Sequence, residues 1–346
     1  MTDQIHHVAL ASRPSGSPVP ENFRFEPAPM PELQDGDVLV KLHYLSLDPY
    51  MRGRMDDAES YIAPVEIGGT MHGGGVGEIV ASKSPDFKPG DLAYGMLGWT
   101  THAAAPAETV NKIELKHGSM TNTLGVLGMP GFTGWVGLME YGRPKAGETL
   151  VVAAATGPVG SMVGQLAKSL GLRVVGIAGG AEKCQMAIET FGFDACLDHR
   201  AHDDAASLTA ALNAACPRGI DIYFENVGGK VLEAVLPLMN SFGRIPVCGM
   251  ISWYNAGNLG ESVVEAGLAG PKIWRMILVN SLSVTGFIIL DHWHRYPDFV
   301  AEIGPRVDAG EIKFVEDIVE GLENAPAAFM GLLDGKNKGK QIVKIA

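Results

Sequence analysis

The chain has 346 residues, of which 46% are hydrophobic and 19% are charged, a composition that is ordinary for globular proteins and long enough for two domains. Its formal net charge of −12 comes without a cluster of Lys and Arg, which argues against nucleic-acid binding, and no apolar run reaches the length of a membrane span. The N-terminus has no signal-peptide pattern and the four cysteines have no paired spacing, so we expect a cytoplasmic protein without a disulfide scaffold or structural zinc cluster.

The first part of the chain, residues 1–128, has the pattern of a β-rich, barrel-like domain. Short strands are predicted at Asp37–Tyr44 and Gly74–Ala81, and the turn Lys88–Asp91 follows the second of them. Strands that are interrupted by Pro and Gly at short intervals are typical of such domains.

Residues 129–304 change in character, because apolar strands alternate there with amphipathic helices. Strands are predicted at Thr149–Ala154, Arg173–Ala178, Ile220–Glu225, Gly243–Cys248 and Leu282–Gly286. Helices are predicted at Gly160–Leu170, Ala181–Phe191, Ala205–Ala215 and Gly229–Leu238. Alternation of this kind, with almost uninterrupted apolar strands, predicts an α/β domain with a Rossmann-type, doubly wound parallel sheet.

The last segment, residues 305–346, is mixed in character and ends in a strand-like stretch at Gln341–Ile345. A β-ended tail after an α/β domain suggests a return to the first domain. We therefore expect this segment to fold back onto residues 1–128.

The stretch from Thr149 to Gly164 predicts a phosphate-binding turn. A buried strand runs into the pattern A-x-G-x-x-G, in which Ala155, Gly157 and Gly160 hold the motif positions, and a helix follows. Gly157 allows close approach of a pyrophosphate, and Gly160 allows the helix to pack on the strand. The N–H groups at the start of the helix then bind the phosphates, so this turn predicts dinucleotide binding rather than a plain strand-to-helix turn.

The residues after the second strand favour NADPH over NADH. An NAD-selective site places Asp or Glu at the tip of that strand, but here the tip reads Gly179-Gly180-Ala181. Lys183 follows near the start of the next helix, and Arg200 ends the next loop. The absence of an acidic residue at the strand tip, together with two nearby cations, indicates a site for a 2′-phosphate. Lys183 and Arg200 would each also fit a solvated position on the surface.

A catalytic zinc ion is not expected. Residues 1–183 contain no cysteine, and His72 is followed by Gly73. A lone His in a glycine-rich segment is more often structural than a ligand. Without a Lewis acid, a carbonyl group must be polarised by hydrogen-bond donors, for which Tyr is a suitable residue.

Several longer motifs resemble those of the zinc-independent medium-chain dehydrogenase/reductases. They are LSLDPYMRGRM at 45–55, GVLGMPGFT at 125–133, AAATGPVG at 153–160, VVGIAGGAEKC at 174–184, ENVGG at 225–229, RIPVCG at 244–249 with WYN at 253–255, and GLLDGKNKGK at 331–340. The branch that they resemble is that of leukotriene B4 dehydrogenases and prostaglandin reductases, and within it the bacterial NADPH-dependent curcumin reductases. The resemblance covers the whole chain and implies a GroES-like first domain.

The resemblance also implies roles for individual residues. The cofactor-binding set is Thr133, Gly157, Pro158, Val159, Gly160, Gly180, Lys183, His199, Arg200, Asn226, Cys248, Gly249, Ile251, Tyr254, Phe287, Ile288, Ile289 and Asn337. The substrate set is Tyr50, Tyr61, Met129 and Trp135. Tyr254 is the first candidate for a catalytic hydrogen-bond donor and Tyr50 the second. Packing remains an alternative role for Tyr50, Met129 and Trp135, as does a contact to ribose for Tyr254.

Two positions depart from the family pattern. His199 stands where the family often has Tyr near the 2′-phosphate, and the charge of a His depends on pH near neutrality. Thr133-Gly134-Trp135 replaces the family's Thr-Ala-Tyr. This difference could change the shape of the substrate pocket, so the resemblance does not define the identity of the substrate.

The activity that the resemblance implies is NADPH-dependent reduction of the activated C=C bond of α,β-unsaturated ketones and aldehydes, including curcumin-like substrates, by a homodimer. An NADPH-dependent quinone reductase, a non-enzymatic NADPH sensor and a zinc alcohol dehydrogenase remain as alternatives.

Overall fold

The computed structural model describes residues 4–57, 63–256 and 270–345. The chain divides into two compact units. The first unit comprises Met1–Gly125, Tyr254–Ser262 and Glu316–Ala346, and the second comprises Val126–Trp253 and Val263–Val315. Tyr61 lies outside the described residues.

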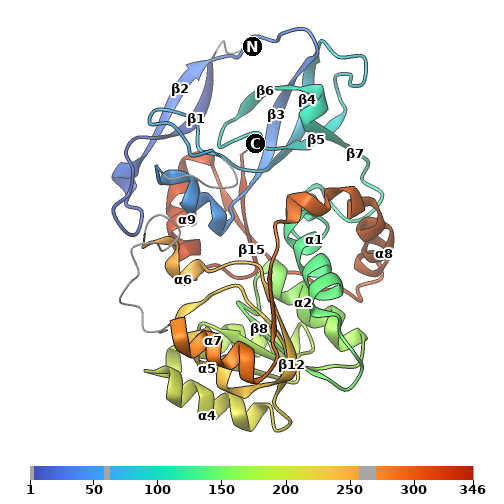
Figure 1. The fold of residues 1–346 in the computed structure, drawn as a ribbon. Helices are drawn as coiled ribbons and strands as arrows, with labels where there is room; N and C mark the ends of the chain where they lie inside the picture. The colour runs from blue at the N-terminus through green and yellow to red at the C-terminus, as the bar shows by residue number, and fades with distance from the viewer. Residues whose placement is uncertain (1–3, 58–62, 257–269, 346) are drawn as a thin grey trace. The chain divides into compact units, whose positions relative to one another are not determined.

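The first unit is built mainly of β-strands (Figure 1). An antiparallel ribbon joins β1 (Gln4–Leu10) and β2 (Phe23–Pro29). A seven-stranded sheet has the order β14-β15-β3-β4-β5-β7, with β6 also paired to β3. Its strands are β3 (Asp37–Ser46), β4 (Gly75–Ser82), β5 (Leu92–Gly95), β6 (His102–Pro106), β7 (Val110–Ile113), β14 (Glu316–Glu320) and β15 (Lys340–Lys344).

The C-terminal segment contributes strands to this sheet. Strand β15 pairs antiparallel with β3, with Ile342 opposite Ser46 and Val343 opposite Leu45. Helix α9 (Ala325–Leu333) and the 3-10 helix η2 (Pro49–Met55) contribute to the same hydrophobic core. The tail folds back because Ile342 and Val343 are fully buried there.

The second unit contains a six-stranded, all-parallel sheet with the order β10-β9-β8-β11-β12-β13. Its strands are β8 (Thr149–Ala153), β9 (Arg173–Ala178), β10 (Ala195–Asp198), β11 (Ile220–Phe224), β12 (Met239–Val247) and β13 (Ser283–Gly286). In order of sequence this is 3-2-1-4-5-6, the arrangement of dinucleotide-binding sheets. The expected Rossmann-type fold is therefore confirmed.

Helices cover both faces of this sheet (Figure 1). They are α1 (Met129–Val136), α2 (Pro158–Ser169), α3 (Ala181–Glu189), α4 (Ala205–Ala215), α5 (Gly229–Val235), α7 (Gly270–Val279) and α8 (Tyr296–Asp308), and α6 (Ile251–Tyr254) is a single turn. A π-helical turn, η5 (Gly137–Gly142), extends α1, and a 3-10 helix, η9 (Ile289–Arg295), precedes α8. No helix in the described ranges is long and apolar enough to cross a membrane.

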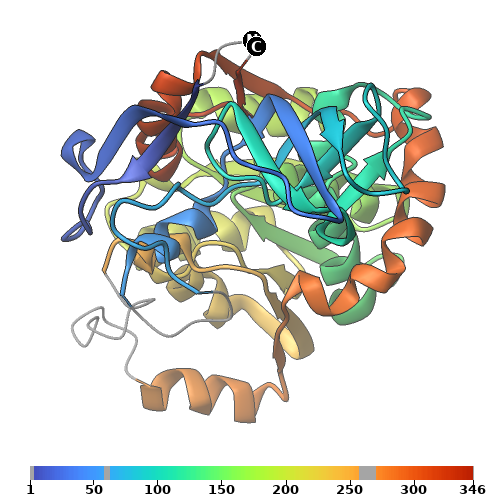
Figure 2. The same ribbon diagram turned by 90° about the horizontal axis from the view of Figure 1, so that it is seen from above.

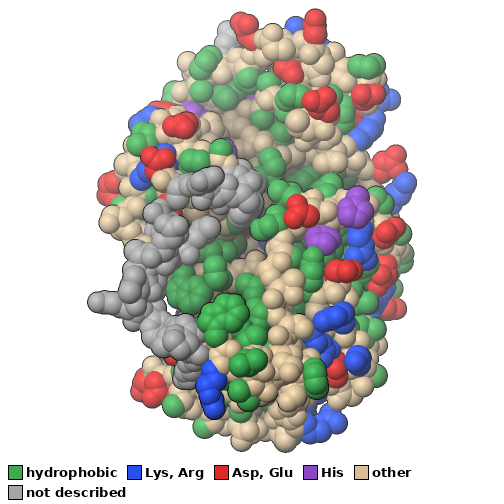
Figure 3. Space-filling model, viewed as in Figure 1, with side chains coloured by type: hydrophobic (Ala, Val, Ile, Leu, Met, Phe, Trp, Pro, Cys, Tyr) green, Lys and Arg blue, Asp and Glu red, His purple; other side chains and the backbone are tan. Residues whose placement is uncertain are grey.

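Helix α7 lies at the margin of the second unit (Figure 2, orange). Hydrophobic side chains gather on the surface around it (Figure 3). Trp274 is 72% exposed and Leu278 is 80% exposed, and Phe242 on β12 is 75% exposed. Isolated exposed apolar residues are normal, whereas a group of large ones indicates a binding surface.

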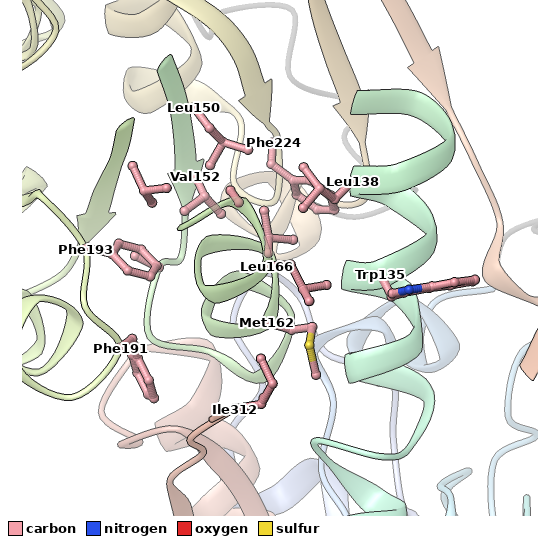
Figure 4. Packing of buried hydrophobic residues seen from close by; sticks show 14 of the residues in the cluster. Trp135, Leu138, Leu150, Val152, Met162, Leu166, Phe191, Phe193, Phe224 and Ile312 are labelled. Carbon is pink, nitrogen blue, oxygen red and sulfur yellow. The ribbon is translucent and has the colours of Figure 1, made fainter. Parts of the chain in front are cut away.

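The core between the sheet and α1, α2 and α8 is dense and apolar (Figure 4). Leu150 and Val152 of β8 are fully buried there, with Leu166 of α2 packed on them. A side chain in place of Gly164 would overlap the ring of Phe193, which shows how closely α2 approaches the segment that precedes β10.

The sequence prediction differs from the structure at several boundaries. Strand β10 was not predicted, because its four residues ACLD are only half-buried and carry no apolar periodicity. Helix α2 begins at Pro158 rather than at Gly160, since Pro is well suited to the first position of a helix. The pattern also did not predict α1, α8 or α9.

Candidate active site at the carboxyl ends of the parallel strands

The turns after β8 and β11 lie at the point where the strand order of the sheet reverses. Ligands of open parallel sheets bind at this point, beyond the carboxyl ends of the strands. The side-chain amide of Asn226, which follows β11, donates to the carbonyl oxygen of Ala153 at the end of β8, over 2.8 Å. Asn226 therefore joins the two turns that border the predicted cofactor position.

The turn after β8 has the shape that a phosphate-binding turn requires. Ala154 takes a left-handed conformation, with φ of 52°, and Gly157 is the N-cap of α2. A Cβ on Gly160 would lie 3.0 Å from the carbonyl carbon of Ala154 and from Cα of Ala155, so the helix packs directly on the turn. The first N–H groups of α2, from Val159 and Gly160, have no carbonyl of their own helix to bind and are suited to phosphate oxygens.

Basic side chains gather beside Gly179, at the end of β9. A Cβ built on Gly179 would lie 2.9 Å from Nε of Arg200 and 3.1 Å from Nε2 of His199. Lys183 lies half-buried in the first turn of α3, which begins two residues after Gly179. Three of the residues predicted for the 2′-phosphate are thus supplied by the segments that follow β9 and β10.

Asp198 and Lys230 also belong to this group, although neither was among the predicted site residues. Oδ1 of Asp198 accepts the N–H groups of Gly180 at 2.7 Å and Arg200 at 2.9 Å. Nζ of Lys230, on α5, donates to the carbonyl oxygens of His199 at 2.9 Å and His202 at 2.5 Å. No sequence motif identifies Lys230, because its partners lie about thirty positions earlier in the chain.

Burial and neighbouring groups shift the pKa values of His199 and Asp198. Burial lowers the pKa of His199, and the positive charges of Lys230 and Arg200 lower it further. Burial opposes ionisation of Asp198, but the backbone N–H groups of Gly180 and Arg200 outweigh it and lower the pKa of this carboxyl group. The result is a carboxylate that holds the loop and a neutral imidazole beside cations.

Glu225 organises the turn after β11. This residue is 2% exposed, and its Oε1 accepts the N–H groups of Val227 at 2.6 Å and Gly228 at 2.8 Å. Burial raises the pKa of the Glu225 carboxyl group, although these backbone N–H groups work against the shift. The sequence motif contained this residue, but its role as the hydrogen-bond acceptor that holds the turn is visible only in the structure.

The segment after β12 lies against this turn through backbone hydrogen bonds. The carbonyl oxygen of Glu225 accepts N–H from Cys248 at 2.9 Å and Gly249 at 3.2 Å, and that of Asn226 accepts N–H from Ile251 at 3.2 Å. Burial, together with the nearby Glu225, raises the pKa of the Cys248 thiol to about 12, so the thiol stays protonated. Cys248, Gly249 and Ile251, all predicted to line the nicotinamide half, are therefore brought together with Asn226.

Phe287 follows β13 and is held by aromatic contacts. Its ring stacks on Tyr141 of η5 at 5.0 Å between centroids, and the Tyr141 hydroxyl is 2.8 Å from Nε2 of His292. Ile288, which is 37% exposed, and Ile289 continue from Phe287 into η9. The π-helical turn thus gives Phe287 a defined position.

The predicted residues of α1 have mainly structural contacts. The Thr133 hydroxyl donates to the carbonyl oxygen of Met129 at 2.7 Å. Trp135 is 5% exposed, its Nε1 donates to Glu302 at 3.1 Å, and Arg295 lies over its ring at 4.8 Å. These contacts correspond to the packing alternative for Trp135.

The first unit contains the remaining predicted residues. Tyr50 lies half-buried in η2 against the core, with the guanidinium carbon of Arg54 at 5.9 Å from its ring centroid. Tyr254 ends the single turn α6 and is half-buried. Nδ2 of Asn337 donates to the carbonyl oxygen of Gly339 at 2.7 Å, which fixes the turn before β15.

His72, the histidine considered as a zinc ligand, is half-buried. Burial and the charge of Arg54 lower the pKa of His72. Within residues 4–57, 63–256 and 270–345, no three His, Cys, Asp or Glu side chains come together as metal ligands.

Comparison with known proteins places this architecture in a family. Two family models match, the N-terminal domain of oxidoreductase over residues 6–113 and zinc-binding dehydrogenase over residues 158–304. The NADPH-dependent curcumin reductase of Escherichia coli is 51% identical over 338 residues, which cover 97% of this chain and 96% of that protein. The chain belongs to the medium-chain dehydrogenase/reductase superfamily.

Two further relatives support the resemblance to the zinc-independent branch of this superfamily. The NADP(+)-dependent 2-alkenal reductase of Nicotiana tabacum is 43% identical, over 90% of this chain and 88% of that protein. The crystal structure of CurA from Vibrio vulnificus in complex with NADPH superimposes with a TM-score of 0.92 at 48% identity, and covers 99% of both chains. The predicted membership of the branch that includes the prostaglandin reductases is confirmed.

Proposed function

We propose that this protein is a reductase that uses NADPH to reduce the carbon–carbon double bond of α,β-unsaturated ketones and aldehydes. The observation that carries the proposal is the group of basic side chains at Gly179, formed by Lys183, His199 and Arg200. This group lies in a chain whose relatives are named as NADPH-dependent reductases of curcumin and of 2-alkenals.

The residues of the second unit fit NADPH. The turn at Gly157–Gly160 would bind the pyrophosphate, because Gly157 leaves its surroundings open while Gly160 holds the helix N-terminus against the strand. Lys183, His199 and Arg200 would bind the 2′-phosphate. Cys248–Ile251 and Phe287–Ile289 would line the nicotinamide half. When bound, NADPH supplies the hydride that the reduction needs.

The protein itself must stabilise the negative charge that develops on the carbonyl oxygen of the substrate. We assign this role to the hydroxyl group of Tyr254, with Tyr50 as the second candidate, because a tyrosine can donate a hydrogen bond to an oxyanion without being deprotonated at neutral pH. One such donor contributes about 3 kcal/mol to the stability of the transition state. Water or the same tyrosine then protonates the α-carbon.

The proposal is tested with a panel of enones, enals and quinones, assayed by the loss of NADPH absorbance with NADH as the control. We expect turnover of enones and enals, and a preference for NADPH. Turnover of quinones alone would instead favour a quinone reductase. Binding of NADPH without oxidation by any compound of the panel would favour a sensor.

The role of Tyr254 is tested separately. In Tyr254→Phe, we expect kcat to fall by about a hundredfold, the rate equivalent of about 3 kcal/mol, with little change in the affinity for NADPH. Tyr50→Phe is the matched variant. If only Tyr50→Phe lowers kcat, the roles of the two tyrosines are exchanged.

We also propose that two copies of the chain form a homodimer through strand β13. This strand ends the order of the six-stranded sheet among the described residues, and all four of its residues are exposed. Val284 of β13 is 45% exposed, and the apolar residues Trp274 and Leu278 of α7 lie in the same unit. A sheet edge with apolar neighbours favours pairing with the same edge of a second copy about a twofold axis.

Sedimentation measurements test this assembly. We expect a dimer for the wild type and a monomer for the double variant Trp274→Glu, Leu278→Glu. Met96→Glu is the control, because Met96 is 55% exposed but belongs to the first unit. A monomeric wild type would refute the proposal.

We place the protein in the cytoplasm, consistent with its four free cysteines.

A further inference from the structure

His199 has an unusual electrostatic environment. It begins the short 3-10 helix η6 (His199–Ala201), and its side chain is half-buried with Nε2 directed at Gly179. The backbone of the same residue is held by Nζ of Lys230. The position of this imidazole is therefore defined from both sides, by the glycine turn after β9 and by helix α5.

Charged groups face His199 from three elements. Lys183 comes from α3, Asp198 and Arg200 flank it in its own segment, and Lys230 comes from α5. All three cations disfavour a proton on the imidazole, whereas Asp198 favours one. Burial acts in the same direction as the cations, so the pKa of His199 is below its usual value in the protein without cofactor.

A 2′-phosphate would reverse this balance. Such a group carries a charge of about −1.5 to −2 at neutral pH, and it would be placed among the cations that now oppose protonation. A neutral imidazole can donate one hydrogen bond, whereas an imidazolium donates from both nitrogens and adds a positive charge. NADH, which has no phosphate at this position, would leave His199 unchanged.

We propose that His199 couples the binding of NADPH to the uptake of a proton, so that the preference for NADPH over NADH increases as the pH falls. This inference rests on the proposed use of NADPH. The physical basis is linkage, because a ligand that binds the protonated form more tightly must also increase the affinity for protons.

The sign of the effect follows from the two states of the protein. Above the range in which free His199 titrates, the protein alone holds no proton on this residue, and the complex with NADPH holds up to one. The Kd for NADPH then rises as the pH rises, by at most tenfold per pH unit from this residue. The 2′-phosphate itself, with a second pKa of about 6, would release a proton in a cationic site, which is the opposite sign.

Isothermal titration calorimetry of the full-length protein measures this coupling. NADPH and NADH are each titrated at several pH values in buffers that differ in ionisation enthalpy, which yields the number of protons exchanged per ligand. We expect more uptake with NADPH than with NADH. In His199→Gln and His199→Tyr, which keep a hydrogen-bond donor but do not titrate near neutrality, the uptake with NADPH should fall by up to one proton.

Lys230 provides a second test. Lys230→Met removes a cation that opposes protonation, so free His199 should titrate at higher pH and the range of proton uptake should move upward. Lys230→Arg keeps the charge and serves as the matched control.

The outcomes separate this inference from the proposed function. Equal proton exchange for NADPH in the wild type and in both His199 variants would overturn the coupling while leaving NADPH as the cofactor. Equal affinity for NADPH and NADH at every pH would instead overturn the proposed cofactor.

Discussion

The two glycines of the phosphate-binding turn should respond differently to the same substitution. The sequence motif treats Gly157 and Gly160 alike, but their surroundings differ. A Cβ on Gly160 would lie 3.0 Å from the carbonyl carbon of Ala154 and closer still to its oxygen. A Cβ on Gly157 would have as its nearest contact the same oxygen at 3.4 Å, which is an ordinary distance.

The loss of stability expected for Gly160→Ala depends on which atoms must shift to make room for the methyl group. The neighbours of Gly160 are backbone atoms of a turn in which Ala154 already has a φ of 52°, so the helix must shift rather than a side chain. Overpacking of this kind costs about 1 to 3 kcal/mol, of which the higher helix propensity of Ala returns up to about 1 kcal/mol. Because the contact is with backbone atoms, we take the upper part of this range, about 2 to 3 kcal/mol, which leaves a net loss of about 1 to 2 kcal/mol after the gain of about 1 kcal/mol in helix propensity. At about 2 to 4 °C per kcal/mol, Gly160→Ala should lower the melting temperature by about 2 to 8 °C.

Thermal unfolding without cofactor and NADPH titration together test this reasoning. We expect Gly157→Ala to keep the melting temperature and to weaken NADPH binding, because the methyl group would lie in the space that the pyrophosphate needs. Gly160→Ala should lower both stability and affinity. A Gly160→Ala protein as stable as the wild type would refute the claim that the helix start is packed on the turn.

Two further predictions concern buried charges. Glu225→Leu should lower the free energy of unfolding, measured with urea, by about 2 to 4 kcal/mol, because two backbone N–H groups lose their acceptor. Glu225→Gln keeps an acceptor oxygen, so its free energy of unfolding should stay close to that of the wild type. Because the pKa of Glu225 is raised, its ionisation costs stability as the pH rises above the value for an unfolded Glu, and Glu225→Gln should flatten this part of the pH profile. Lys340 is 3% exposed and its Nζ lies 2.6 Å from Asp48. Lys340→Met should therefore lower the free energy of unfolding by about 3 to 5 kcal/mol, because the buried carboxylate loses its partner. The double variant with Asp48→Leu should recover much of this loss. A double variant no more stable than Lys340→Met would contradict the pairing.

Much of the fold was predictable because it depends on local patterns. The strands β8, β9 and β11 and the helix α4 were predicted within one residue of their observed ends, since buried parallel strands form uninterrupted apolar runs. Strand β10 was not, because a short strand at the edge of a sheet is only half-buried.

The candidate site was predictable only in part. Glycines at Gly157 and Gly160 and the cation Lys183 can be identified by their distance from a strand end. The supporting residues cannot, because Lys230 and Glu225 act on backbone groups whose positions depend on how separate strands are paired.

The sequence alone determined the parallel sheet, the phosphate-binding turn and the absence of an acid at the tip of β9, because each is set by residues within one strand–turn–helix segment. The tertiary structure decided that His199 lies among cations from α3 and α5, that Glu225 braces the turn after β11, and that Trp135 is packed in the core. These features arise from contacts between segments that are distant in the chain, and a linear pattern carries no information about such distances.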